Sequence, residues 1–183
     1  MSSPRILLVR FSSLGDVLLI TPLIRALRAR HPAATLTALT KQGWAPLLSA
    51  NPHLDEVVTV SPGQSLVPLA RAIRGERFTH LLDLHGSVRT RVLRLLVPGP
   101  WTGYDARRAA RQRLIRTHED RYPDRLPVAE RYFEAARTLG AGARAALRRA
   151  ALRALRVVER PAAAHRAAVR PHLAAAASRT LRF

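Results

Sequence analysis

The 183-residue sequence has no cysteine and only one lysine, and none of its apolar stretches reaches 18 residues. Without cysteine the chain can form no disulfide, thiol nucleophile or cysteine-ligated metal site. Without a long apolar run, a membrane-spanning helix is not expected. The apolar stretch from Ile6 to Val9 is too short for the core of a secretory signal. We therefore expect a cytoplasmic protein.

Acidic residues are also scarce, with 12 against 31 lysines and arginines, which gives a formal charge of +19. Lys41 is the one lysine, so arginine supplies nearly all of the positive charge. Together with abundant alanine, leucine and proline, this composition indicates a GC-rich genome, and codon bias accounts for part of the charge. A positive surface still attracts nucleic acid, anionic lipid or phosphorylated glycolipid.

The composition changes near residue 140, which divides the chain into a domain over 1–140 and an Ala/Arg-rich tail over 141–183. The tail holds ten arginines against one acid, Glu159, and has no glycine beyond Gly142. Three interpretations stay open: a basic helix, a disordered extension, or an out-of-frame translation of GC-rich DNA. The first rests on four apolar residues at helical spacing: Leu147, Ala151, Leu155 and Val158.

Strand and helix patterns alternate through the first 140 residues. Short apolar or β-branched runs predict strands over 5–11, 35–40, 56–60, 80–85 and 101–104. Helical patterns cover 16–30, 44–50, 65–74, 87–96 and 127–139, with a basic segment over 107–116. Pro22 predicts a kink in the first helix or a later start. This alternation predicts an α/β fold: a parallel sheet with helices on both faces.

In such a sheet the ligand site lies beyond the carboxyl ends of the strands, so the residues after each strand carry the functional information. The first such segment is 12–16, Ser-Ser-Leu-Gly-Asp. Gly15 allows a tight turn, backbone amides at the helix start could receive a phosphate, and Asp16 would reach the cleft. Asp16 or a serine capping the helix is the competing interpretation. The segment is neither a Gly-x-Gly-x-x-Gly loop nor a P-loop.

The second segment runs over 83–90. Asp83 falls in an apolar strand, where an acid is costly unless it is paired. His85 and Gly86 follow at the strand end, and Arg89 lies in the first turn of the next helix. The group could bind a polar or anionic ligand. Alternatively, Asp83 bonds to backbone amides and Ser87 caps the helix.

The third segment, over 103–108, places Arg107 and Arg108 after a strand. Arginine pairs with phosphate or carboxylate through two parallel hydrogen bonds, although a solvated basic loop would look the same. The remaining histidines include His31, His53, His80 and His118, and their spacing does not match a metal site.

In this order, the segments resemble glycosyltransferase family 9, the ADP-heptose:lipopolysaccharide heptosyltransferases. The resemblance rests on 10–18 with Thr21-Pro22 and Leu27, on 51–57, on Asp83-x-His85-Gly86 with Arg89-Thr90, and on Gly103-Tyr104-Asp105 with the arginines after it. It covers about residues 5–140. Each motif alone is weak, and their occurrence together in order is the specific signal.

The resemblance implies the Rossmann-like N-terminal half of a two-domain GT-B enzyme. That half holds a lipopolysaccharide core or similar phosphorylated glycolipid acceptor, and heptose is transferred from ADP-heptose with inversion. Asp16 matches the family's catalytic base, and the resemblance extends substrate binding to Ser12, Ser13, Gly15, His85, Arg89, Arg107 and Arg108. No metal or other cofactor is expected, and peripheral contact with the inner membrane stays open.

The chain has about half the family's length, and its tail does not resemble the start of a sugar-nucleotide domain. We therefore expect a truncated protein that alone binds ADP-heptose poorly and transfers little or no sugar. Two other functions fit parts of the sequence. A non-catalytic basic module would bind nucleic acid or an anionic membrane surface, but few aromatics accompany the arginines and no known nucleic-acid motif is present. A phosphoacceptor receiver domain would need an acidic pair after the first strand, where only Asp16 is found.

Overall fold

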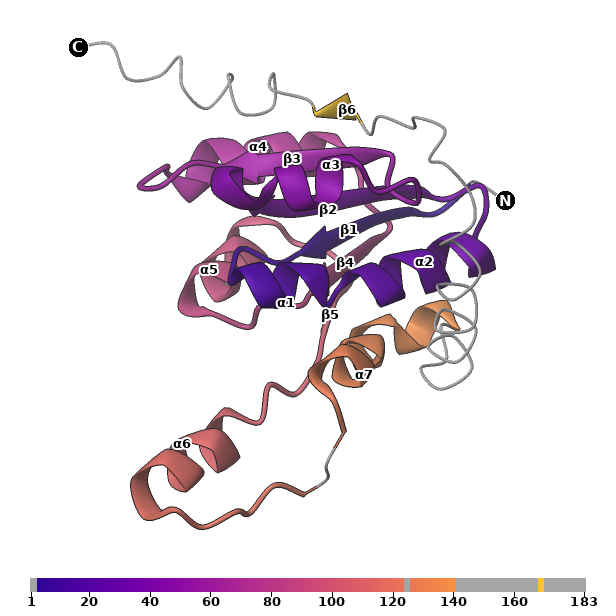
Figure 1. Ribbon diagram of the computed structural model, residues 1–183. Coiled ribbons are helices and arrows are strands. Elements are labelled where there is room, and N and C mark those ends of the chain that lie inside the picture. The colour runs from indigo at the N-terminus through magenta and orange to yellow at the C-terminus, as the bar shows by residue number, and fades with distance from the viewer. Residues whose placement is uncertain (1–2, 124–125, 141–167, 170–183) are drawn as a thin grey trace, which may run out of the picture.

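The computed structural model describes residues 3–123, 126–140 and 168–169, and its centre is a parallel sheet (Figure 1). The strand order is β5-β4-β1-β2-β3-β6. The strands are β1 (Arg5–Val9), β2 (Thr35–Lys41), β3 (Glu56–Val60), β4 (His80–Asp83), β5 (Trp101–Gly103) and β6 (Ala168–Val169). Every neighbouring pair is parallel, with Leu8 of β1 beside Ala38 of β2 and Leu82 of β4. The predicted α/β fold is confirmed.

Helices cover both faces of the sheet, because alternate residues of the buried strands point to opposite sides. The helices are α1 (Leu14–Leu18), α2 (Thr21–Arg30), α3 (Pro46–Ser49), α4 (Leu66–Gly75), α5 (Val88–Leu96), α6 (Arg108–Thr117) and α7 (Val128–Tyr132), with 3-10 turns at Gln42–Trp44 and Phe133–Leu139. Ile6 and Leu8 pack with α1, α2, α3 and the α7 region. Leu7 and Val9 pack with α4 and α5 on the other face.

Several predicted elements differ from the structure in their boundaries: the strand expected over 5–11 ends at Val9, and the helix expected over 44–50 is a 3-10 turn followed by the short α3. Three other differences have a local cause or change the kind of element. The helix expected over 16–30 is two helices, and Pro22 lies in the first turn of the second, where its missing N–H costs nothing. The strand expected to reach His85 ends at Asp83. The Asp83 carboxylate accepts hydrogen bonds from the His85 and Gly86 amides, which turns the chain. The helix expected over 127–139 becomes a 3-10 segment after Tyr132, with a kink at Ala136.

The tail prediction lies mostly outside the described residues, and so do the four apolar residues that carried its helical interpretation. The exception is β6, a two-residue strand that continues the sheet beside β3. No strand was expected there from the composition. Its pairing places Ala168 beside Glu56 and Val169 beside Val57.

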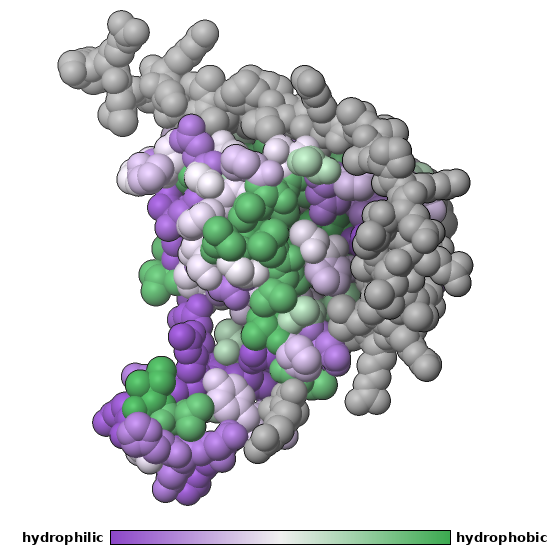
Figure 2. All heavy atoms as spheres, in the orientation of Figure 1, coloured by the Kyte–Doolittle hydropathy of each residue, from purple (hydrophilic) through white to green (hydrophobic). Residues whose placement is uncertain are grey.

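The segment that carries α6 extends away from the body of the domain (Figure 1). No residue of α6 is buried, and Ile115 is 65% exposed. Figure 2 shows mostly polar side chains along this arm with a small apolar group on it, and further apolar side chains gathered over α1, where Leu14 and Leu18 are 46% and 43% exposed. Among the described residues, no helix is long and apolar enough to cross a membrane.

Candidate active site at the carboxyl ends of β1, β4 and β5

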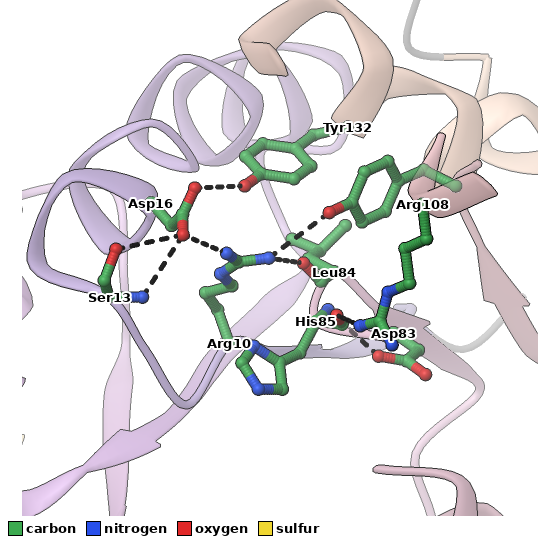
Figure 3. A network of polar contacts seen from close by, with 9 residues as sticks. Arg10, Ser13, Asp16, Asp83, Leu84, His85, Arg108 and Tyr132 are labelled. Carbon is green, nitrogen blue, oxygen red and sulfur yellow. Dashed lines mark hydrogen bonds and ion pairs between the residues drawn. The ribbon is translucent and has the colours of Figure 1, made fainter. Parts of the chain in front are cut away.

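Polar side chains meet where β1, β4 and β5 end, since these strands are neighbours and run in the same direction (Figure 3). The segment after β1 supplies Arg10, Ser13 and Asp16, and the segment after β4 supplies His85. The segment after β5 supplies Arg108. Five of the eight site residues predicted from the sequence have contacts in or next to this region: Ser13, Asp16, His85, Arg89 and Arg108.

Asp16 lies at the centre of a polar network. One of its oxygens, Oδ2, forms an ion pair with Arg10 Nη2 and accepts hydrogen bonds from Ser13 N at 3.2 Å and Ser13 Oγ at 3.1 Å. The other, Oδ1, accepts a hydrogen bond from the Tyr132 hydroxyl at 3.3 Å. About a third of the Asp16 side chain, 32%, stays exposed. The bond from the Ser13 amide is the capping contact that the competing interpretation predicted, so Asp16 caps α1 and also faces solvent.

Arg10 is buried, with 6% of its surface exposed, which is rare for arginine unless it is paired. Its Nη1 donates to the Leu84 carbonyl at 2.5 Å and to the Tyr104 hydroxyl at 3.3 Å. Its guanidinium also lies over the Tyr132 ring, 5.6 Å from the centroid. Arg10 therefore ties together the segments that follow β1, β4 and β5.

Electrostatics keep Asp16 ionised. Partial burial alone would raise its pKa, but the Arg10 charge and the hydrogen bonds from Ser13 outweigh this and lower the pKa below its ordinary value. Tyr132 shows the opposite shift, because burial raises the pKa of its hydroxyl well above the usual range. At neutral pH the pair is therefore a carboxylate that accepts a hydrogen bond from a neutral phenol.

Asp83 has a structural part at the same edge. It is 3% exposed, and its Oδ1 accepts hydrogen bonds from His85 N at 3.0 Å and Gly86 N at 2.7 Å. Ser87 Oγ accepts a hydrogen bond from Thr90 N at 3.2 Å and caps α5. The simpler of the two interpretations of this segment, a buried aspartate bonded to amides plus a helix cap, is the one observed.

The His85 ring packs edge-on against the Phe11 ring, with ring centroids 5.7 Å apart. Burial lowers its pKa, and the charges of Arg10 and Arg108 lower it further, against opposing effects from Asp83 and the Ser12 backbone. At neutral pH the ring is therefore uncharged. Its Nδ1 is buried and has no hydrogen-bond partner among the described residues.

The three predicted arginines lie differently. Arg89 lies over the Phe11 ring, 5.7 Å from its centroid, and donates to the Gln64 carbonyl at 2.7 Å. Arg108 Nη2 donates to the His85 carbonyl at 3.1 Å. Arg107 pairs with Asp105 at 2.6 Å within its own exposed loop. Arg108 is thus held beside His85, Arg89 against Phe11, and Arg107 by Asp105.

The tight turn expected at Gly15 is not present. Gly15 lies inside α1 without a positive φ, so no tight turn requires glycine there. A Cβ atom added at this position would meet nothing within 4 Å. Ser12, partly exposed, precedes Ser13 through a cis peptide bond. Among the described residues, no group of three histidines or acids is placed to hold a metal ion.

Solved structures share this fold. A glycosyl transferase of family 9 from Veillonella parvula aligns with 77% of this chain at 25% identity and a TM-score of 0.60. The ADP-heptose lps heptosyltransferase II of E. coli aligns with 72% at 27% identity and a TM-score of 0.54. The structural neighbours are glycosyltransferases of family 9. The resemblance inferred from the motifs is therefore confirmed in structure.

A third neighbour, E. coli heptosyltransferase WaaC with ADP, aligns with 76% of the chain at 24% identity and a TM-score of 0.59, which supports the fold alone. This chain spans 43%, 40% and 48% of the three neighbours, in the order given, so it matches less than half of their length. No protein-family model and no curated protein matches the sequence.

Sequence reasoning did not assign a role to Arg10, Tyr104 or Tyr132. Arg10 is next to a buried strand, and that position is the one local signal that a charge there is paired. Tyr132 lies 116 residues from Asp16 along the chain. No spacing rule joins residues so distant, and their contact depends on how α7 packs against the sheet.

Proposed function

We propose that this chain forms the acceptor-binding side of a heptosyltransferase-like glycosyltransferase, which transfers heptose from ADP-heptose to the core of a lipopolysaccharide or a similar phosphorylated glycolipid. The observation that carries the proposal is Asp16: an ionised, partly exposed carboxylate at the carboxyl ends of the strands, in a fold shared with family 9 glycosyltransferases. With a glycolipid acceptor, the protein would work in the cytoplasm in peripheral contact with the inner membrane.

In the proposed reaction Asp16 is the general base. An acceptor hydroxyl loses its proton to the carboxylate while its oxygen attacks the anomeric carbon of the donor sugar. The bond from that carbon to the nucleotide breaks, and ADP leaves with the bonding electrons. Attack from the face opposite the leaving group inverts the configuration. In this step the chain contributes one carboxylate, and ADP-heptose is a substrate rather than a bound cofactor.

Arg89 and Arg108 are the residues proposed to bind anionic groups of the acceptor. Arg108 bonds to the His85 carbonyl, and Arg89 lies over Phe11, which packs against His85. Both keep guanidinium N–H groups beyond those used in their one hydrogen bond to a carbonyl. Neither forms an ion pair among the described residues, whereas Arg107 does. An acceptor phosphate could therefore pair with them without displacing a carboxylate.

The test is acceptor binding by the 183-residue chain, measured by isothermal titration calorimetry with a phosphorylated lipid A–core glycolipid. Substituting Arg89→Gln or Arg108→Gln should weaken binding about tenfold each, because a charged hydrogen bond contributes roughly 1.5–3 kcal/mol. The loss should shrink as salt rises, since screening weakens the contact in the unsubstituted protein.

Two comparisons make this test specific. Arg71→Gln changes an exposed arginine of α4 outside the site and should leave binding unchanged. Removing the acceptor's phosphates should weaken binding to the unsubstituted chain and abolish the difference between it and the Arg89 and Arg108 variants. Equal losses with phosphorylated and dephosphorylated acceptor would refute the role in phosphate binding. Tight, salt-dependent binding of duplex DNA without acceptor binding would favour the nucleic-acid module instead.

A further inference from the structure

The two oxygens of Asp16 differ in how many hydrogen-bond donors they meet. Oδ2 has three partners: the Arg10 guanidinium, the Ser13 amide and the Ser13 hydroxyl. Oδ1 has one, the Tyr132 hydroxyl, at the longer distance of 3.3 Å. Because a carboxylate oxygen can accept two hydrogen bonds, Oδ2 is saturated and Oδ1 retains a free lone pair. Figure 3 shows the two sets of partners on opposite sides of the carboxylate.

Contacts other than Asp16 hold Arg10 in place. Its Nη1 bonds to the Leu84 carbonyl and the Tyr104 hydroxyl, and its guanidinium lies over the Tyr132 ring. Burial prevents the side chain from turning to solvent. The positive charge beside Oδ2 is therefore a fixed part of the fold.

Tyr132 is held just as firmly. It is fully buried, and it packs edge-on against Tyr104 with ring centroids 4.8 Å apart and an interplanar angle of 84°. Its hydroxyl keeps its proton at neutral pH, so it remains a donor toward Oδ1. The groups that face Asp16 are thus Arg10 from the end of β1, Ser13 from its own loop and Tyr132 from α7. Tyr104 accepts a hydrogen bond from Arg10, and the Arg10 charge acts on His85.

We propose that Arg10 and Tyr132 are positioning residues that assign different tasks to the two Asp16 oxygens: Arg10 and Ser13 fix Oδ2, and Oδ1, oriented by the single bond from Tyr132, takes the acceptor's proton. This inference rests on the proposed function of Asp16 as a base. The proton moves from the acceptor hydroxyl to Oδ1, and the three contacts of Oδ2 persist. Arg10 weakens the base but keeps it ionised and aligned at neutral pH.

The first measurement needs no substrate. The carboxyl carbons of the full chain are labelled with carbon-13, the Asp16 signal is assigned through Asp16→Asn, and its pKa is followed by NMR. Arg10→Met should raise the pKa of Asp16 by about one unit or more, because an adjacent opposite charge lowers a carboxyl pKa by roughly 1–3 units. Arg10→Lys should restore most of the shift, because it returns the charge without the planar fork.

Tyr132→Phe removes one hydroxyl and keeps the ring in its packed position. It should raise the Asp16 pKa by less than Arg10→Met does, because a neutral hydrogen bond stabilises a carboxylate less than a charge does. In a transfer reaction completed by an added donor-binding half, it should lower kcat about five- to tenfold, the effect of one lost hydrogen bond, with the acceptor KM unchanged. Amide NMR spectra of each variant report whether the fold is retained.

The outcomes separate the two proposals. An Asp16 pKa that does not respond to Arg10→Met in a folded variant overturns the positioning role, whatever the activity. A pKa that rises with Arg10→Met and is not restored by Arg10→Lys also overturns it. The rise would then come from the altered packing that both variants share, because Arg10→Lys keeps the charge. If the pKa responds as expected but Asp16→Asn does not slow transfer, the effect of Arg10 on the Asp16 pKa is retained. The function of Asp16 as a base is then refuted.

Discussion

In a transfer reaction completed by an added donor-binding half, replacing Asp16 with asparagine should slow sugar transfer about 10²- to 10⁴-fold, the usual contribution of a positioned general base. Asparagine has nearly the same shape and keeps an oxygen that can accept the Ser13 hydrogen bonds, but it cannot take a proton at neutral pH. The acceptor affinity should change no more than a few-fold, because the residues proposed to hold the phosphates are elsewhere. Single-turnover mass spectrometry of the product detects rates that steady-state assays miss.

Glu76→Gln is a matched control for this substitution. Glu76 also forms a carboxylate–arginine pair, with Arg5 at 2.5 Å. It follows α4 and pairs with the first residue of β1, so it lies at the amino ends of the strands, away from Asp16. Removing its charge should leave transfer unchanged and alter stability by less than about 1 kcal/mol. Equal rates for Asp16→Asn and the unsubstituted protein would show that Asp16 is a helix cap alone.

Much of the fold could be predicted because local patterns determine it. The five strands expected from apolar or β-branched runs are all present, and Ser87 caps its helix as expected. The errors occur where a side chain competes with the backbone pattern. Asp83 ends β4 early by accepting two amide hydrogen bonds, and no periodicity encodes that. The helical spacing over 127–139 also gives no signal of the kink at Ala136.

The position of the site could be predicted from the sequence, but the side-chain contacts within it could not. Parallel strands bring their carboxyl ends to one edge, so Asp16 and His85 were expected near each other. What surrounds Asp16 could not be read in advance, because Arg10 bonds to residues 74 and 94 positions away and Tyr132 reaches Asp16 from α7. These contacts turn a residue that caps a five-residue helix into a fixed, ionised carboxylate.

Asp16 and Asp83 both lie at the carboxyl ends of the strands but have different surroundings, and stability measurements should show the difference. Asp83→Ala should lower the free energy of unfolding by about 2–4 kcal/mol, because it leaves the His85 and Gly86 amides without their acceptor in a buried turn. Urea denaturation followed by circular dichroism should show a lower midpoint with an unchanged slope.

Asp83→Asn gives the sharper comparison. It keeps an oxygen for both amides and loses only the negative charge, which faces Arg94 Nη1 at 3.9 Å, so it should cost about 1 kcal/mol or less. Asp16→Asn should cost more than Asp83→Asn, about 2 kcal/mol or more, because it leaves the buried Arg10 guanidinium without its ion-pair partner. A small loss for Asp83→Ala would contradict the structural role of Asp83. The expected large loss for Asp83→Ala, beside a small one for Asp83→Asn, assigns Asp83 to folding through its amide hydrogen bonds. Asp16, whose side chain is 32% exposed against 3% for Asp83, is then the carboxylate available for chemistry.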